Sequence, residues 1–319
     1  MRRRQLLSLA AGSALAGACA ARDKNELLHV SFDATRELFA EVNETFAASD
    51  LRIRQSHGGS GKQTRSVMEG LQADVVSLAL GFDVDALAKA GLLASDWRSR
   101  MPFESSPLRS TVVLLVRAGN PKGISGFGDL ARDDVSVITP NPKTSGGARW
   151  NHLAIWDFAL RETGNRGRAE DFMRAVYSHV PVLDSGARGA MTTFAKRRIG
   201  DVLIAWESEA RVALSKFKGA VEVVVPSRSV RADIPVAVLD KVVDHRGTRA
   251  TTERYAAFLF SETAQAIFPR FGFRPAESDP ADFARVEFFN VTELGDSWAS
   301  LHEEHFAEGA LFDRVSDRS

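Results

Sequence analysis

Apolar positions along the chain follow two spacings, one typical of strands and one typical of helices. Residues 28–32 form a first apolar run, and a helical pattern follows over 35–48, where Leu38, Val42 and Phe46 recur every four residues. Further strand or helix patterns follow at 51–55, 64–71, 75–80 and 84–92. This order predicts parallel strands joined by crossover helices that cover both faces of a sheet.

A second α/β set begins after a polar passage at 101–110. Its strand patterns lie at 111–116, 135–139, 180–183, 201–206 and 221–226, and its helix patterns at 150–161, 171–177 and 190–198. A further apolar strand at 234–239 precedes a helix at 251–259 and a Phe-rich C-terminal region.

The two sets predict an α/β fold of two lobes with a ligand cleft between them. The strands at 111–116 and 234–239 would connect the lobes, and the C-terminal helices would return to the first lobe. Lobe 1 would comprise 27–113 and 237–319, and lobe 2 would comprise 114–236. Two crossings beside a cleft suit hinge closure around a ligand.

The stretch TPNPKTSGGARW, residues 139–150, lies between a predicted strand and a predicted helix. Pro140 and Pro142 disfavour helix before the turn. Ser145, Gly146 and Gly147 then leave the backbone uncovered where the helix should begin. The unpaired N–H groups and the dipole of a helix start both favour an anion, although a single such turn is more often purely structural.

Three other predicted joints resemble this one, at 31–33, 56–61 and 184–189. Two of them are rich in Ser and Gly, and Ser60 with Gln63 fits a capping box. Because ligands of open α/β sheets lie at the carboxyl ends of the strands, the four joints would converge on one cleft. Each N–H bond to a charged oxygen contributes roughly 1.5–3 kcal/mol, so such a cage would hold a small dianion.

Charge and motifs exclude several other classes of function. The 319 residues include 41 basic and 41 acidic side chains, which is no basic excess for nucleic acid. No His or carboxylate cluster has metal-ligand spacing, and no dinucleotide-binding glycine motif occurs. We therefore expect no metal, no cofactor, no nucleic-acid partner and a monomeric chain.

The segment 56–62 resembles a P-loop and a nucleophile elbow without completing either. Gln63 stands where a P-loop needs Ser or Thr, and Lys62 stands where the elbow needs glycine. Ser60 and His57 lie close in sequence, so a secreted serine hydrolase is kept as an alternative from a different class.

Residues 1–19 are typical of an export signal. Arg2, Arg3 and Arg4 precede a short apolar segment at 6–16, which is too short to anchor in a membrane. The arginine pair resembles a twin-arginine signal. Cys19, the single cysteine, stands where a lipoprotein signal places its acylated residue, and ordinary cleavage beside it is the other route. Both routes predict a periplasmic or exported protein, with or without a lipid tether.

Five segments resemble those of periplasmic sulfate-binding proteins, the receptors of sulfate/thiosulfate ABC importers. The resemblance spans nearly the whole chain from residue 27 to 315. The segments are SFDATREL (31–38), QSHGGSGKQ (55–63), VITPNPKTSGGARWN (137–151), VLDSGARG (182–189) and GDVLIAWE (200–207). The family has the type II two-lobe binding-protein fold, with its anion buried in the cleft.

The resemblance also implies a role for individual residues. Backbone N–H groups, one hydroxyl and one indole N–H would bind the anion, and four more side chains would hold the peptide units that carry these donors. The implied anion contacts are Asp33, Ser60, Ser145, Gly146, Gly147, Ala187 and Trp206. The implied supporting residues are His57, Asp83, Arg149 and Arg188.

The implied shell contains donors only, which suits an anion without a proton. Phosphate keeps a proton near neutral pH and needs an acceptor, so we expect rejection of phosphate and sulfate binding that changes little between pH 5 and 8. The resulting expectation is a receptor for sulfate, with thiosulfate as a possible ligand, that serves membrane ABC permease subunits. A receptor for another tetrahedral oxyanion, such as molybdate, is the alternative within this fold.

Overall fold

The computed structural model describes residues 25–47 and 51–317, so the predicted export signal and Cys19 lie outside the described part. The first sheet has the strand order β12-β3-β1-β2. β1 (Glu26–Phe32) pairs in parallel with β2 (Arg52–Gly58) and β3 (Val75–Ser77), and β12 (Val236–Val238) is antiparallel to β3. Six of the seven β1 residues are buried, because β1 is a central strand with helices on both faces.

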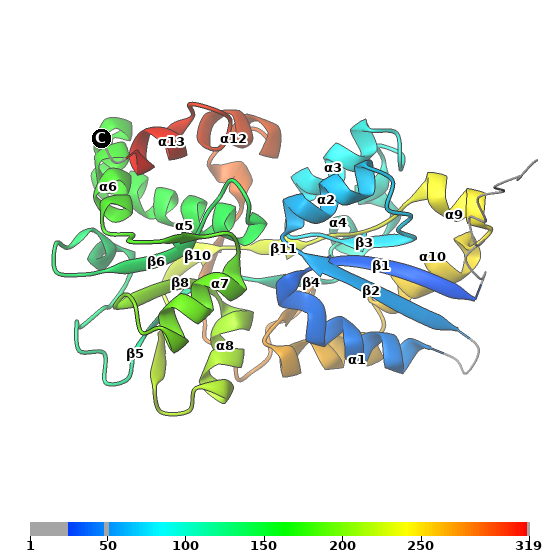
Figure 1. Ribbon diagram of the computed structural model, residues 1–319, viewed down its shortest axis with the longest axis horizontal. Helices are drawn as coiled ribbons and strands as arrows, with labels where there is room; N and C mark the ends of the chain where they lie inside the picture. The colour runs from blue at the N-terminus through cyan, green and yellow to red at the C-terminus, as the bar shows by residue number, and fades with distance from the viewer. Residues whose placement is uncertain (1–24, 48–50, 318–319) are drawn as a thin grey trace, which may run out of the picture.

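The helices of the first sheet lie in two layers (Figure 1). α2 and α3 cover one face of the sheet, and α1 and α10 cover the other. The layers contain α1 (Arg36–Phe46), α2 (Ser60–Met68), α3 (Gly81–Lys89), α9 (Asp240–Arg246), α10 (Arg249–Phe258) and α11 (Glu262–Ile267). Leu38, Phe39 and Val42 of α1 are fully buried, which confirms the predicted apolar face of that helix.

The second sheet has five strands in the order β7-β6-β8-β5-β9. β6 is parallel to β7 and β8, whereas β5 is antiparallel to β8 and β9. Its elements are β5 (Val112–Arg117), β6 (Val137–Pro140), β7 (Leu183–Asp184), β8 (Val202–Trp206), β9 (Val221–Val224), α5 (Gly146–Thr163), α6 (Arg166–Ser178), α7 (Ala187–Met191) and α8 (Glu207–Lys216). α5 and α6 lie on one face, and α7 and α8 lie on the other (Figure 1).

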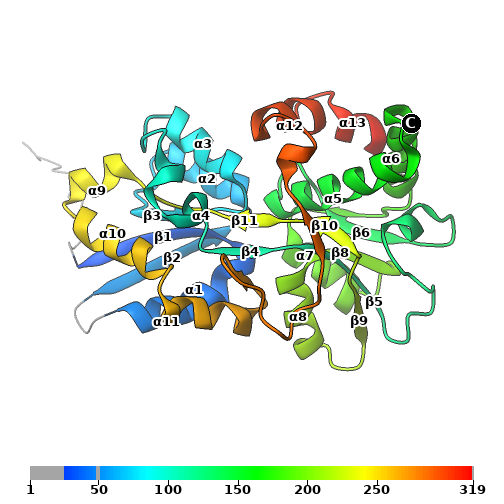
Figure 2. The same cartoon turned by 180° about the vertical axis from the view of Figure 1, so that it is seen from behind.

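A small three-stranded sheet connects the two halves. β4 (Leu108–Ser110) pairs antiparallel with both β11 (Ala232–Ile234) and β13 (Arg274–Pro275). The chain then crosses a third time, from β13 to β14 (Glu287–Phe289), which pairs with β10 (Arg228–Val230) (Figure 2). The chain therefore crosses between the halves three times, and not twice as the sequence pattern predicted. The crossing strands β4 and β11 come directly before the apolar strands that were predicted to connect the lobes.

The C-terminal helices divide between the halves. α11 contacts α1 beside the first sheet, as predicted, but α13 (Leu311–Ser316) packs against α6. α12 (Trp298–His305) and α13 thus lie over the second half, contrary to the expectation that all these helices return to lobe 1 (Figure 2). The third crossing explains the difference, because the sequence contains no long apolar strand to mark it.

The remaining short helices connect these elements. They are η1 (Asp33–Thr35), η2 (Trp97–Arg100), α4 (Pro102–Ser105), η3 (Phe127–Ala131), the π-helix η4 (Thr192–Lys196), η5 (Phe268–Phe271) and η6 (Val291–Glu293). Among the described residues, no helix combines the length and apolar character needed to cross a membrane. The two sheets with helices on both faces and the linking strands confirm the predicted two-lobe α/β fold.

Candidate anion site

The start of α5 lies directly against the first lobe. A Cβ atom built on Gly146 would lie 3.0 Å from the Cβ atoms of both Ser60 and Ala79. A Cβ atom on Gly59 would likewise lie 3.0 Å from the carbonyl oxygen of Thr144. Glycine is needed at both positions because two backbone segments from different lobes approach more closely than a side chain allows. The joints at 56–61 and 139–150 therefore meet, as the topology predicted.

Ser60 is the first residue of α2, and Gly59 is its N-cap. The predicted capping box is therefore wrong: the Ser60 hydroxyl donates to Asp83 Oδ2 and accepts the Ala79 N–H at 3.0 Å. The Gln63 amide instead donates to the Ser31 carbonyl oxygen at 3.3 Å. Ser60 ties α2 to the strand-to-helix joint before α3, which fixes the orientation of its own peptide unit.

Asp83 and Arg149 support this joint from opposite lobes. Arg149 Nη1 lies 3.9 Å from Asp83 Oδ1, and Arg149 Nε donates to the Pro142 carbonyl oxygen at 3.1 Å. Burial raises the pKa of Asp83, whereas Arg149 and the Ser60 hydroxyl lower it. The buried carboxyl group thus has a hydroxyl donor and a cation beside it, so it is not available as an acceptor for a ligand.

Three kinds of hydrogen-bond donor from the second lobe lie at the start of α5. They are the Ser145 hydroxyl, the Trp206 indole N–H and the peptide N–H groups of the two glycines. The Ser145 hydroxyl caps the helix by accepting the Ala148 N–H at 3.3 Å. Trp206 Nε1 donates to the Gly147 carbonyl oxygen at 3.2 Å, and a Cβ atom on Gly147 would lie 3.3 Å from that nitrogen. α5 begins at Gly146 instead of the predicted Trp150, so the first peptide units of the helix are those of the two glycines. Their N–H groups lack partners within the helix.

The joints at 31–33 and 184–189 also meet across the two lobes. Arg188 Nη2 donates to the Asp33 carbonyl oxygen at 3.2 Å and to both Glu37 carboxylate oxygens at 2.9 Å. η1, which begins at Asp33, contacts α7, which begins at Ala187. The Thr144 hydroxyl donates to the Ser185 carbonyl oxygen at 2.9 Å and connects this joint to the start of α5.

His57 lies behind the site in a neutral network. Its Nδ1 is 2.8 Å from Ser31 Oγ, and its Nε2 is 2.5 Å from Gln55 Oε1. Burial, together with the charge of Arg36, lowers the pKa of His57 to about 4. Both ring nitrogens are occupied away from Ser60, so the Ser60–His57 pair that a hydrolase would need is not formed.

The charges around these joints favour an acceptor-only ligand. The Asp33 carboxylate is partly exposed and pairs with Arg36 at 3.2 Å. Asp83 is held by Ser60 and Arg149. The carboxylates of Asp33 and Asp83 thus have cationic partners, while the Ser145 hydroxyl and the Trp206 indole N–H lie beside the helix-start N–H groups of α5. Among the described residues, no group of three or more His, Cys, Asp or Glu side chains has the arrangement of a metal site.

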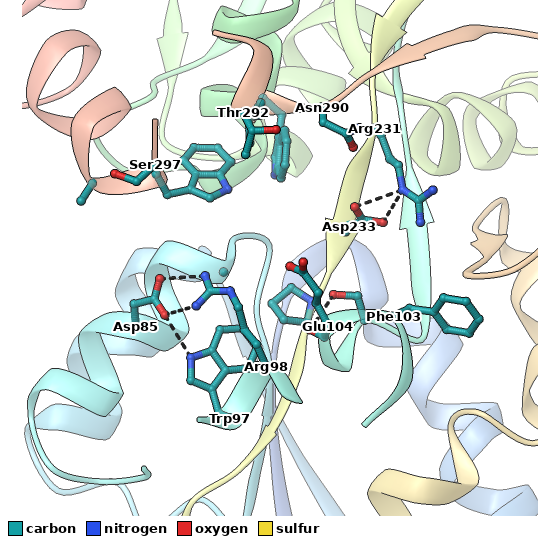
Figure 3. Close-up of a pocket in the computed structure, with 17 residues that line it drawn as sticks. Asp85, Trp97, Arg98, Phe103, Glu104, Arg231, Asp233, Asn290, Thr292 and Ser297 are labelled. Carbon is teal, nitrogen blue, oxygen red and sulfur yellow. Dashed lines mark hydrogen bonds and ion pairs between the residues drawn. The ribbon is translucent and has the colours of Figure 1, made fainter. Parts of the chain in front are cut away.

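A separate cavity of about 690 Å³ lies between α3, α12 and the hinge strands (Figure 3). Its lining includes the carboxylates of Asp85, Glu104 and Asp233, and none of the eleven residues implied by the resemblance. Bidentate pairs with Arg98 and Arg231 occupy two of these carboxylates. Acidic groups around so large a space are unsuited to a small dianion, so this cavity is not the anion site.

Sequence reasoning missed two contacts, of which one joins the lobes and one lies within the second lobe. Trp150 Nε1 donates to the Ala79 carbonyl oxygen at 2.8 Å across the lobes, and Thr144 bridges two joints of the second lobe. Trp150 carries no sequence signal beyond its place on an apolar helix face. Its polar contact depends on how the lobes face each other, which a periodic pattern does not contain.

Converging helix starts between two α/β halves define the class: a two-lobed solute-binding protein. The model of the family described as bacterial extracellular solute-binding protein matches residues 28–274. The chain belongs to this family. The predicted family resemblance is confirmed at the level of the whole chain by the relatives below.

The chain is 48% identical to the sulfate-binding protein of Escherichia coli (strain K12), over 92% of this chain and 93% of that protein. It is 42% identical to the thiosulfate-binding protein of Pseudomonas aeruginosa, over 96% of each. The solved structure of the sulfate-binding protein SubI from Mycobacterium tuberculosis H37Rv superposes with a TM-score of 0.78 and 30% identity, covering 88% of this chain and 99% of that chain. A molybdate-binding protein of Mycobacterium bovis is 30% identical over 34% of this chain and 40% of that protein.

Proposed function

We propose that this protein is a receptor that captures sulfate between its lobes and delivers it to a membrane ABC permease. The observation that carries the proposal is the meeting of four strand-to-helix joints, where the carboxylates of Asp33 and Asp83 are already paired with cations. Such a shell suits a fully ionised dianion, because every ligand oxygen accepts and no protein acceptor is needed.

The proposed sulfate contacts are those that the resemblance implies. Peptide N–H groups of Asp33, Ser60, Gly146, Gly147 and Ala187, the Ser145 hydroxyl and the Trp206 indole would donate to the anion. The geometry at the start of α5 supports this assignment, because Trp206 Nε1 and Ser145 Oγ lie 3.3 Å and 3.8 Å from the Cβ position of Gly147. In the ligand-bound form the indole N–H would turn from the Gly147 carbonyl oxygen to the anion.

Thiosulfate is the second ligand that the relatives favour, because one of them is a thiosulfate-binding protein. Thiosulfate replaces one sulfate oxygen with a larger and weaker acceptor, so the same cage would bind both anions with different affinity. Molybdate has weaker support, since the molybdate-binding relative matches about a third of the chain. A larger oxyanion would also separate Gly146 from Ser60, which are in close contact here.

A binding role is favoured over catalysis. His57 contacts Ser31 and Gln55, and the Ser60 hydroxyl contacts Asp83 and the Ala79 N–H, so the histidine–serine pair of a hydrolase is not formed. We therefore propose that the protein is not an enzyme and acts in the periplasm or outside the cell. The lipid tether at Cys19 and the monomeric state remain predictions of the sequence.

Isothermal titration of the purified protein with sulfate, thiosulfate, molybdate and phosphate tests the ligand. We expect sulfate or thiosulfate to bind most tightly and phosphate to bind at least 100-fold more weakly. Equal affinity for phosphate and sulfate would refute the donor-only site.

A pair of variants then tests the backbone mechanism. Gly147→Pro removes a proposed N–H donor, whereas Ser60→Ala retains its N–H and loses the hydroxyl contacts to Asp83 and to the Ala79 N–H. Gly147→Pro should therefore weaken sulfate binding far more than Ser60→Ala. Equal losses would contradict binding through peptide N–H groups. Circular dichroism of both variants checks that each remains folded.

A further inference from the structure

The C-terminal arm, defined as residues 297–316, is fixed to the second lobe. The Lys143 ammonium group donates to the carbonyl oxygens of Phe306 and Ala307 at 2.9 Å and 2.8 Å and pairs with Asp313 at 2.8 Å. α13 packs against α6 beneath it. Lys143 belongs to the joint at 139–150, so the arm moves with the residues proposed to bind the anion.

The arm also touches the first lobe through α12. The ring of His302 stacks on the ring of Phe82 at the start of α3, with centroids 4.6 Å apart and planes at 22°. α12 and α3 face each other across the two halves of the molecule in both views (Figures 1 and 2). The stack therefore joins the lobes on the side of the molecule that carries α3, α5 and α12.

The stack lies beside an open cavity between the lobes. The cavity of about 690 Å³ separates Gly81 and Asp85 of the first lobe from Ser297 and Trp298 of the arm (Figure 3). Opening the lobes on this side would break the stack, together with the Trp150 bond to Ala79 and the contact of Arg149 with the Phe82 ring. An interlobe contact of this kind changes the equilibrium between the open and closed forms and does not stabilise the fold of either lobe.

Phe82 also leads directly to the anion site. It precedes Asp83, which accepts the Ser60 hydroxyl. The Arg149 guanidinium carbon lies 5.8 Å from the Phe82 ring centroid and 5.5 Å from that of Phe306. The stack therefore covers the outer side of the interlobe pair Arg149–Asp83, and its loss would admit water to that pair.

We propose that the Phe82–His302 stack is a latch that holds the lobes closed and slows release of the bound anion. The kinetic part rests on the proposed function, whereas the closing of the lobes does not depend on the ligand. Both residues are positioning residues, because neither contacts the proposed anion. Among the described residues, His302 Nδ1 is buried without a hydrogen-bond partner, so a phenyl ring at 302 would keep the stack and remove an unpaired polar atom.

Release kinetics provide the first test. Stopped-flow tryptophan fluorescence after dilution of the sulfate complex gives koff for the wild type, Phe82→Ala, His302→Ala and the double variant. An aromatic pair of this geometry predicts about a three- to tenfold faster koff in each single variant, an unchanged kon and no further effect in the double variant. His302→Phe should release sulfate more slowly than the wild type. Phe103→Ala, an exposed phenylalanine on the wall of the same cavity, is the matched control with unchanged koff.

A ligand-independent distance measurement distinguishes failure of the latch from failure of the proposed function. Spin labels on Lys89→Cys and Arg168→Cys, both exposed and in different lobes, report lobe separation in a chain with Cys19→Ser. Phe82→Ala should shift the distance distribution of the sulfate-free protein toward the open form. Unchanged distances would overturn the latch even if sulfate binds. Absence of sulfate binding with a shifted distribution would overturn the proposed ligand and retain the latch.

Discussion

Gly146→Ala should block closure of the lobes around the anion while leaving each lobe intact. The added Cβ atom would lie 3.0 Å from Ser60 Cβ, 3.0 Å from Ala79 Cβ and 3.4 Å from a Leu80 methyl group. All three neighbours belong to the first lobe, and Gly146 belongs to the second. The strain can therefore be relieved by opening the cleft by a few tenths of an ångström.

The size of the effect follows from the cost of overpacking. One methyl group forced into a tight contact costs about 1–3 kcal/mol, and here it acts only on the closed form. Sulfate would be bound with this penalty, so its Kd should rise about 5- to 150-fold. The unfolding temperature of the sulfate-free protein should not fall, because alanine is a better helix former than glycine and the open form has no clash.

Isothermal titration and thermal unfolding with and without sulfate would measure both quantities. Gly61→Ala is the matched control, because its Cβ atom would have no neighbour within 4 Å and its position is one residue into α2. That control should bind sulfate as the wild type does. Two results would refute the assignment of this contact to lobe closure. One is a sulfate affinity of Gly146→Ala equal to that of the wild type. The other is a loss of stability in the sulfate-free variant as large as its loss of binding free energy.

Three further predictions concern donors, charge and the hinge. Trp206→Phe keeps a ring against Phe32 but loses the indole N–H, so calorimetry should show sulfate binding weakened by about 1.5–3 kcal/mol, and thermal unfolding should show a lower stability because the buried indole and its bond to Gly147 are lost. Burial raises the pKa of Glu209 to about 7 from 4.5, so the folded state holds its proton longer and stability should fall as pH rises through this range. Urea unfolding gives the free energy of unfolding at pH 4 and pH 8, and its fall between these pH values should be about 2–3 kcal/mol smaller in Glu209→Gln than in the wild type. An equal fall in the two proteins would contradict this role of Glu209. Arg274 is fully buried and donates to both Glu207 carboxylate oxygens at 2.7 Å and 2.8 Å. Arg274→Met should therefore lower the free energy of unfolding by about 3–5 kcal/mol, measured by urea titration. A smaller loss would indicate that the Glu207 carboxylate becomes hydrated in the variant.

The expectation of pH-independent sulfate binding depends on the titratable side chains near the proposed site, and the sequence pattern did not show that Glu209 is one of them. His57 agrees with it, because its pKa of about 4 keeps the ring neutral between pH 5 and 8. Glu209 does not, because it titrates near pH 7 and the charges of Arg188 and Asp33 act on it. A dianion bound nearby would raise this pKa further, so binding should take up a fraction of a proton near pH 7. Calorimetry in buffers of different ionisation enthalpy would detect that uptake.

The sequence alone determined the two α/β lobes and the family, because both are contained in local patterns. Apolar strand patterns of four to six residues, the helical spacing between them, and Ser- and Gly-rich joints are set by neighbours along the chain. The candidate residues were named from the resemblance to the sulfate-binding family, and the recurring Gly-rich helix starts agree with it. The position of Ser60 as an N-cap was the local exception, because a tertiary contact with Asp83 engaged its hydroxyl.

Only the tertiary structure decided how the lobes face each other. The close approach of Gly146 to Ser60, the Trp150 bond to Ala79 and the stack of His302 on Phe82 all join residues that lie 71 or more positions apart. The third crossing, which carries α12 to the second lobe, is made by short strands with no periodic signature. Contacts between lobes depend on rigid-body placement and on single side chains, and neither leaves a repeating pattern in the sequence.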